Sequence, residues 1–271
     1  MSDVDDIGAH LQHRTKEVER DLDFAARCFN GITAFQGTPE DNWGLPQGQP
    51  QWLLDAHNTK SGKCFLMGTG PSITKQKDLL AKLENEETFT VNRMRQWKDL
   101  PFTPTHHCIA EPGPVGSWGK EIFPQYDFPK ALNRLAINWW PVTAEGWLWI
   151  NKAPDDIQCR WEGYWGWQDF LPPIPTAWAS PLTIGQIALW LGYTELYFLG
   201  MDLTQVGQAW DVAQGRTAME RNIRSILECA ERAQRDVTRA GRKIMDCTPG
   251  GRFNREGILE YVPLEEVLEL C

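Results

Sequence analysis

Short apolar runs bounded by polar residues recur along the chain from Lys63 onward and predict buried strands. The first three are Lys63–Gly68 (KCFLMG), Thr88–Asn92 (TFTVN) and His106–Ala110 (HHCIA). Between the first two, leucines at helical spacing give Thr74–Glu87 one apolar face. A strand, a helix and a second strand at this spacing form a β-α-β unit, so we expect a parallel sheet.

The same alternation returns towards the C-terminus. Ser180 and Pro181 predict a helix start, with serine as the N-cap and proline at the first helical position. A strand is expected at Glu195–Gly200 (ELYFLG). Apolar residues three or four apart predict the longest helix over Arg216–Ala240, and Lys243–Cys247 (KIMDC) predicts the strand after it. We expect Glu195–Gly200 and the first three strands to be parallel neighbours in one sheet.

Two regions lack this pattern. Residues 1–57 predict an arm that is helical over His10–Asn30 and then rich in Gly, Pro, Gln and Asn. Residues 112–179 have no clean period beyond one predicted strand at Trp147–Ile150, and the stretch from Trp139 to Trp178 holds eight of the chain's 14 tryptophans. We expect this segment to be an irregular insertion or lid over the carboxyl edge of one α/β domain spanning residues 58–271.

Composition narrows the classes of function. Lys and Arg total 27 against 36 Asp and Glu, a net charge of -9 without a basic run, which argues against binding to nucleic acid or to an anionic membrane. No apolar stretch is long enough for a membrane span, and the acidic N-terminus is not a signal peptide. The seven cysteines are widely spaced without a C-x-x-C pair, so we expect free thiols in a cytoplasmic protein and no zinc site.

The sharpest local motif is Gly68-Thr69-Gly70-Pro71-Ser72, which follows a predicted strand and opens a predicted helix. Glycines there let backbone amides approach a ligand, and a helix N-terminus favours an anion. The motif is neither G-x-G-x-x-G nor a Walker loop. We favour contact with a phosphate or nucleotide, and the alternative is a tight strand-to-helix turn without a ligand.

The order of several short segments resembles a Rossmann-like superfamily. These segments are GTGPSI, TVNRM and PTHHCIAEPG, then TIG, LGYTELYFLGMDL, DCTPGG and VPLEEVL, within about residues 60–110 and 180–268. The superfamily holds bacterial sialyltransferases that use CMP-sialic acid, together with proteins like 6-hydroxymethylpterin diphosphokinases and flagellin-modifying glycosyltransferases. The resemblance implies a Rossmann-like fold whose mostly parallel sheet is flanked by helices.

The resemblance also implies roles for individual residues. The loop from Gly68 to Ser72 would face the nucleotide phosphates or ribose, and Asn92 would contact the nucleotide or the donor sugar. Thr183 and Gly185 would lie near the nucleotide base, and Gly200 and Asp202 would close the pocket after the next strand. The carboxyl end of the last strand would carry Thr248, Pro249 and Gly250.

One departure concerns catalysis. The sialyltransferases of this superfamily carry a histidine base before the long helix, whereas MDLTQVGQAWDVAQGRT contains none. Asp211 or Asp202 would then act as the base, or the adjacent His106 and His107 from the other side. Neighbouring strand residues point to opposite faces, so the two histidines cannot both line one site, and we favour packing roles for them.

The resemblance implies a sialyltransferase-like, nucleotide-sugar-dependent glycosyltransferase, which would act by direct displacement. The donor would be CMP- or UDP-linked, the acceptor a glycan or small molecule, and no metal would be required. One alternative is a diphosphokinase-like phosphoryl transferase using ATP and Mg²⁺, with Glu111 and Asp202 at the metal. Another is a non-catalytic binding or structural protein.

The tryptophans admit two interpretations. Trp161, Trp165 and Trp167 beside Tyr164 could form a platform for the acceptor, or the tryptophans could form a small hydrophobic subcore, which we favour for most of them.

Overall fold

The computed structural model describes residues 50–92, 94, 97–109, 136–141, 148–151, 179–203 and 220–269. The chain divides into two compact units, Met1–Gly48 and Gln49–Cys271. Helix α2 (Gln51–Asp55) therefore belongs to the unit that holds the sheet, and the division falls nearer the N-terminus than the predicted boundary at residue 57. The reason is visible in the packing, since Leu53 is fully buried and its carbonyl accepts a hydrogen bond of 2.8 Å from Trp190 Nε1.

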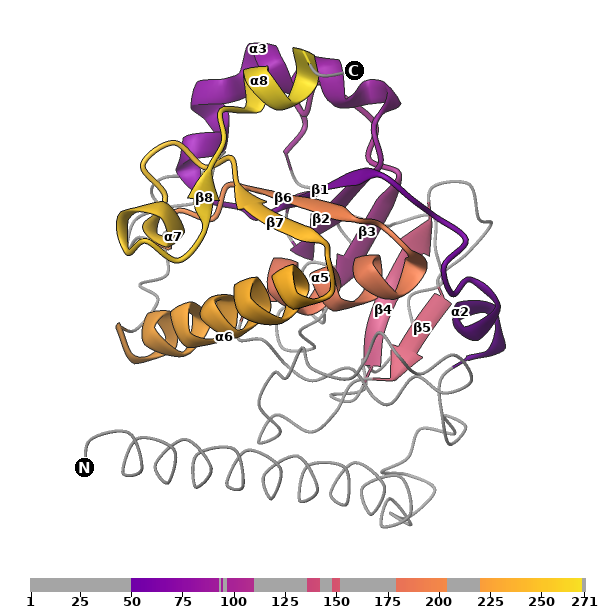
Figure 1. The fold of residues 1–271 in the computed structure, drawn as a ribbon. Coiled ribbons are helices and arrows are strands. Elements are labelled where there is room, and N and C mark those ends of the chain that lie inside the picture. The colour runs from indigo at the N-terminus through magenta and orange to yellow at the C-terminus, as the bar shows by residue number, and fades with distance from the viewer. Residues whose placement is uncertain are drawn as a thin grey trace, which may run out of the picture. The chain divides into compact units, whose positions relative to one another are not determined.

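The described strands form one eight-stranded sheet in the order β5-β4-β3-β2-β1-β6-β7-β8 (Figure 1). Six of them run parallel as consecutive neighbours, which confirms the predicted parallel sheet and its four adjacent strands. Strands β4 and β5 extend the sheet beyond β3 in antiparallel fashion. The strands are β1 Lys63–Met67, β2 Thr88–Val91, β3 His106–Ile109, β4 Ala136–Pro141, β5 Leu148–Asn151, β6 Glu195–Leu199, β7 Lys243–Asp246 and β8 Glu260–Tyr261.

The order of the parallel strands defines the fold. Numbered along the chain, the six parallel strands lie in the order 3-2-1-4-5-6, which is the Rossmann order. The chain leaves β1 towards β2 on one side and leaves β6 towards β7 on the other. The topological switch point therefore lies between β1 and β6, whose last residues, Met67 and Leu199, are paired.

Helices cover both faces of the sheet. In Figure 1, α3 (Lys77–Leu80) and α8 (Leu264–Glu269) lie over one face, and α5 (Ser180–Leu191) and α6 (Glu220–Arg239) lie over the other. Two 3-10 helices, η1 (Pro71–Gln76) and η2 (Ala81–Asn85), flank α3 in the chain. The short helix α7 (Arg252–Arg255) follows β7 and precedes β8 in the chain. Because both faces are covered, the parallel strands are apolar runs rather than alternating ones.

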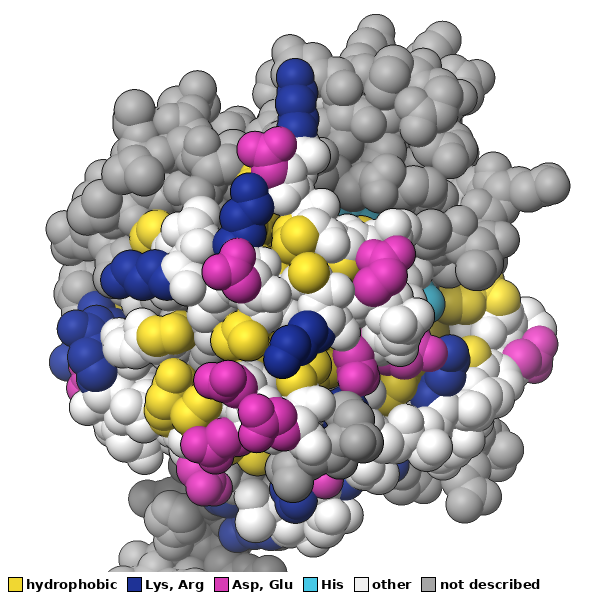
Figure 2. All heavy atoms as spheres, turned by 90° about the horizontal axis from the view of Figure 1, so that it is seen from above, with side chains coloured by type: hydrophobic (Ala, Val, Ile, Leu, Met, Phe, Trp, Pro, Cys, Tyr) yellow, Lys and Arg dark blue, Asp and Glu magenta, His cyan; other side chains and the backbone are white. Residues whose placement is uncertain are grey.

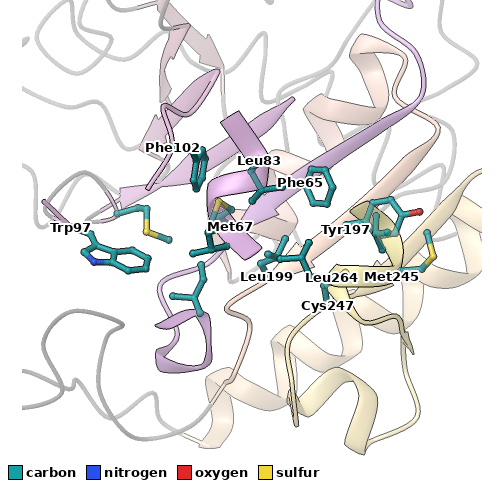
Figure 3. Close-up of a cluster of buried hydrophobic side chains, with 14 residues drawn as sticks. Phe65, Met67, Leu83, Trp97, Phe102, Tyr197, Leu199, Met245, Cys247 and Leu264 are labelled. Carbon is teal, nitrogen blue, oxygen red and sulfur yellow. The ribbon is translucent and has the colours of Figure 1, made fainter. Parts of the chain in front are cut away.

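Alternate residues of the central strands form the core beneath α3 and α8 (Figure 3). Phe65 and Met67 of β1 are fully buried there beside Leu199 of β6. On the opposite face, every residue of α5 is buried, so this helix packs all round its circumference. Leu80, Leu83, Tyr197, Met245, Cys247, Leu264 and Val267 complete the part of the core between these strands and the short helices.

Three local predictions need correction. The segment expected to be one helix over Thr74–Glu87 is instead η1, α3 and η2, although Leu80 and Leu83 still face the core as their spacing predicted. Helix α5 has Ala179 as its N-cap, so Ser180 is its first residue and does not cap it. The tryptophan-rich segment contributes β4, which was not expected, and β5, which confirms the strand expected at Trp147–Ile150 with a shift of one residue.

Figure 2 shows the face that carries the short helices. Acidic and basic side chains are interspersed there with scattered apolar ones, so no single sign of charge dominates the described part of this face.

Candidate functional site at the switch point

The loops that follow β1 and β6 are interlocked by backbone hydrogen bonds. The amide of Gly68 donates to the Leu199 carbonyl at 2.7 Å, and the amide of Gly70 donates to the Gly200 carbonyl at 2.9 Å. This close approach needs glycine, because a Cβ on Gly68 would lie 2.5 Å from the Gly200 oxygen. Gly200 itself has a φ of 65°, a left-handed conformation that favours glycine.

Asp202 ties the two loops together through Ser72. The Ser72 backbone amide donates to Asp202 Oδ1 at 3.1 Å, and the Ser72 hydroxyl donates to Oδ2 at 2.7 Å. A side chain on Gly70 would collide with the same Oδ2. The carboxylate therefore fills the space beside the first turn of η1, where an anion would have to lie if this loop were a phosphate cradle.

Strand β7 supports the β6 loop from the other side. The Met201 amide donates to the Thr248 hydroxyl at 3.0 Å, and the Thr248 amide donates to Asp246 Oδ1 at 2.9 Å. Asp246 is fully buried, and its Oδ2 has no hydrogen-bond partner among the described residues. Burial raises the pKa of Asp246 to about 6, against hydrogen bonds from Thr248 and the Asn254 backbone, and the nearby Asp202 charge adds to the rise.

Asn92 joins the end of β2 to the start of α5. Its backbone has a φ of 48°, the left-handed conformation that asparagine tolerates better than most residues. Its Nδ2 donates to the Ser180 hydroxyl at 2.9 Å, so this serine serves the strand end rather than the helix cap. The Asn92 Oδ1 is buried without a hydrogen-bond partner in the described residues.

The other residues predicted for the site lie in helix α5, after β7 or outside the described residues. Thr183 lies in the first turn of α5, and its hydroxyl donates to the Ala179 carbonyl at 3.2 Å. Gly185 is buried farther along the same helix. Gly250 has a φ of 67° and open space where a side chain would project. Outside the described residues lie Asp211, Glu111, Trp161, Tyr164, Trp165 and Trp167.

The adjacent histidines do not reach the switch point. His106 opens β3, where its ring stacks on Phe89 with centroids 4.6 Å apart and its Nε2 lies 3.7 Å from Glu87 Oε2. Burial lowers the pKa of His106, against the opposing effect of Glu87. His107 is fully buried, with Nδ1 2.9 Å from the Thr90 hydroxyl. Both histidines pack within the fold at the start of β3, as favoured from the sequence, and the switch-point loops follow the opposite ends of their strands.

The switch-point site is built from carboxylates, hydroxyls and backbone groups. Within the described ranges, no group of three or more histidine, cysteine or acidic side chains is arranged to hold a metal ion. Four buried cysteines there are free thiols: Cys64, Cys108, Cys229 and Cys247. None of the helices searched in those ranges is long and apolar enough to cross a membrane.

The fold and site define a Rossmann-like α/β protein. No family model and no curated protein matches the chain. Two matching solved structures are both of the sialyltransferase CstII from Campylobacter jejuni, in complex with the substrate analogue cytidine-5'-monophosphate and with CMP-3FNeuAc. The first is 16% identical, covers 76% of this chain and 86% of that chain, and has a TM-score of 0.37. The second is 14% identical, covers 74% and 86%, and has a TM-score of 0.34.

Sequence reasoning missed two members of this site. Asp246 was taken as part of a buried strand, although an aspartate within an apolar run is the signal that could have revealed it, because a buried carboxylate needs partners. Ser180 was assigned to capping, and only its contact with Asn92 shows that it orients the end of β2. The loops after β1, β6 and β7 were correctly brought to one edge of the sheet.

Proposed function

We propose that the protein is a nucleotide-sugar-dependent glycosyltransferase whose donor binds at the carboxyl edge of the sheet, across the switch point between β1 and β6. The observation that carries the proposal is the Rossmann order of the parallel strands, with polar loops gathered where that order reverses. Ligands of open α/β sheets bind in this place. The order of sequence segments shared with glycosyltransferases of this fold supports a sugar nucleotide as the ligand.

The proposed reaction is a direct displacement. The acceptor hydroxyl oxygen attacks the anomeric carbon, the bond from that carbon to the phosphate oxygen breaks, and the nucleotide leaves with the electron pair. The acceptor proton passes to a carboxylate, for which Asp211 is the candidate, while Asp202 serves in binding. The reaction needs no redox partner and, in this proposal, no metal, with a CMP- or UDP-linked sugar as donor and a glycan or small molecule as acceptor.

A ligand panel tests the proposal on the full chain. We expect CMP or UDP to raise the thermal unfolding midpoint equally with Mg²⁺ and with EDTA, because a ligand that binds only the folded state stabilises it by mass action. Purified protein with the corresponding sugar nucleotide should then release the nucleotide and glycosylate members of an acceptor panel. Stabilisation by ATP only with Mg²⁺ would indicate a phosphoryl transferase instead. Binding without any transfer would indicate a protein that keeps the fold without the chemistry.

A further inference from the structure

The Gly68–Ser72 loop was expected to offer its backbone amides to a ligand. In the structure, most of these amides already donate hydrogen bonds within the protein. Those of Gly68 and Gly70 donate to carbonyls at the end of β6, and that of Ser72 donates to Asp202. The next amide, of Ile73, donates to the Gly70 carbonyl at 3.3 Å. Pro71 has no amide hydrogen, so among the described loop residues 68–73 only Thr69 keeps a free backbone donor.

The negative charge beside this loop also disfavours binding of a phosphate. Asp202 puts a carboxylate beside η1, and the buried Asp246 lies close enough for the Asp202 charge to raise its pKa. A phosphate beside these groups would meet like charge without compensating amides. The loop therefore links the ends of β1 and β6, and the polar group that it leaves for a ligand is the hydrogen-bond acceptor Asp202.

Acceptors recognise donors. A carboxylate offers about four lone-pair positions, and Ser72 uses only part of those of Asp202. Asp202 is partly exposed, so a ligand can reach the remaining positions. The donors of a nucleotide that come in an adjacent, uncharged pair are its ribose hydroxyls, and hydrogen bonds from hydroxyl groups to a carboxylate are short and strong.

Resting on the proposed function, we infer that Asp202 selects the ribose of the donor by accepting hydrogen bonds from its 2′- and 3′-hydroxyls. The Gly68–Ser72 loop does not bind the phosphates, which other parts of the chain must hold. Asp202 is then a specificity residue that distinguishes ribonucleotides from deoxynucleotides.

The test compares nucleotides with and without the ribose hydroxyls. Binding of CMP, UDP and their 2′,3′-dideoxy counterparts is measured by calorimetry for wild type, Asp202→Asn and Asp78→Asn. Asparagine keeps an oxygen that can accept a hydrogen bond from Ser72, so the link between the two loops is retained. Asp78 is an exposed carboxylate on α3, and its substitution controls for the change of net charge. We expect wild type and Asp78→Asn to prefer the ribonucleotide at least tenfold, and Asp202→Asn to reduce that preference to less than threefold.

Other outcomes overturn the inference. Wild-type binding without discrimination between ribo and dideoxy forms would do so without any variant, and would leave the proposed function standing. Equal weakening of both forms in Asp202→Asn would reduce Asp202 to a loop support. Tighter binding of both forms would show that the carboxylate only repels the phosphate. Failure of wild type to bind any of the four nucleotides would remove the proposed function as well.

Discussion

The Thr248 hydroxyl accepts a hydrogen bond of 3.0 Å from the Met201 backbone amide, and both residues are buried. One side chain at the end of β7 therefore fixes the backbone of the β6 loop, just before Asp202. Asp202 in turn accepts a hydrogen bond from Ser72 in η1, beyond the loop that follows β1. The loops after three neighbouring strands are thus coupled through side chains, so a change at the end of β7 can move the loop after β1, where we propose that the donor binds.

The first prediction tests this coupling with Thr248→Val. Valine has nearly the same shape as threonine but leaves the buried Met201 amide without an acceptor, which costs about 1–3 kcal/mol. We expect the free energy of unfolding in urea to fall by that amount and nucleotide affinity to fall with it. Thr248→Ser is the matched control, because it keeps the hydroxyl and loses only a methyl group. Equal nucleotide affinity in the two variants would contradict the coupling.

The second prediction concerns Gly70. A Cβ there would collide with Asp202 Oδ2 and lie 2.5 Å from the Gly200 carbonyl oxygen, so even Gly70→Ala must displace backbone. We expect a loss of stability well above the roughly 1–2 kcal/mol of a left-handed alanine. Gly257→Ala measures that reference cost, since Gly257 has a φ of 71° and open space around it. Thermal and urea unfolding of the two variants give the comparison, and a Gly70 variant as stable as the Gly257 variant would refute the interlocked loops.

Much of the fold could be predicted from sequence because buried parallel strands are continuous apolar runs. KCFLM, TFTV and ELYFL became β1, β2 and β6 with their ends within one residue of expectation. The glycine expected after the first strand does follow β1, which borders the switch point. Strand β4 was missed, because AINWWP lies in a segment whose prolines, glycines and tryptophans hide any period.

The sequence predicted that the loops after β1, β6 and β7 gather at one edge of the sheet, but not the contacts that join them. Gly68 and Gly70 were expected to free backbone amides for a ligand, whereas their small size serves the close approach of β6. That difference could not be read from sequence, because a glycine that admits a phosphate and one that admits a carbonyl leave the same signature. The roles of Asp202 and Thr248 likewise depend on pairs 130 and 47 residues apart along the chain.

The third prediction concerns Glu87 at the opposite edge of the sheet. The nearby His106, whose Nε2 lies 3.7 Å from Glu87 Oε2, together with the hydrogen-bonded Lys60 outweighs burial and lowers the pKa of Glu87 to about 2, below its ordinary value of 4.5. The folded state thus favours the ionised form, and this stabilisation is present above pH 4.5 and disappears as the pH falls towards 2. We expect Glu87→Gln to be less stable than wild type near pH 7, with the difference shrinking below pH 4.5. Glu265→Gln, an exposed change on α8, should show no such difference in the same urea titrations.

The last prediction has the opposite sign and concerns Asp246. Burial raises its pKa to about 6 from an ordinary 3.8, so the folded state binds the proton more tightly than the unfolded chain. Its contribution to stability is therefore largest below pH 3.8, declines as the pH rises to about 6 and stays constant above that. Asp246→Asn removes the titration and keeps an oxygen that can accept from the Thr248 amide.

The measurement is the difference in the free energy of unfolding between Asp246→Asn and wild type, which cancels the other titrating groups. We expect the variant to gain on wild type by up to roughly 1.4 kcal/mol per pH unit between pH 4 and 6, and no further above it. A difference that is flat across this range, or that falls with pH, would show that the Asp246 carboxylate is compensated in the folded state. In that case the unpartnered Oδ2 beneath the β7 loop would have to be satisfied by a group outside the described residues.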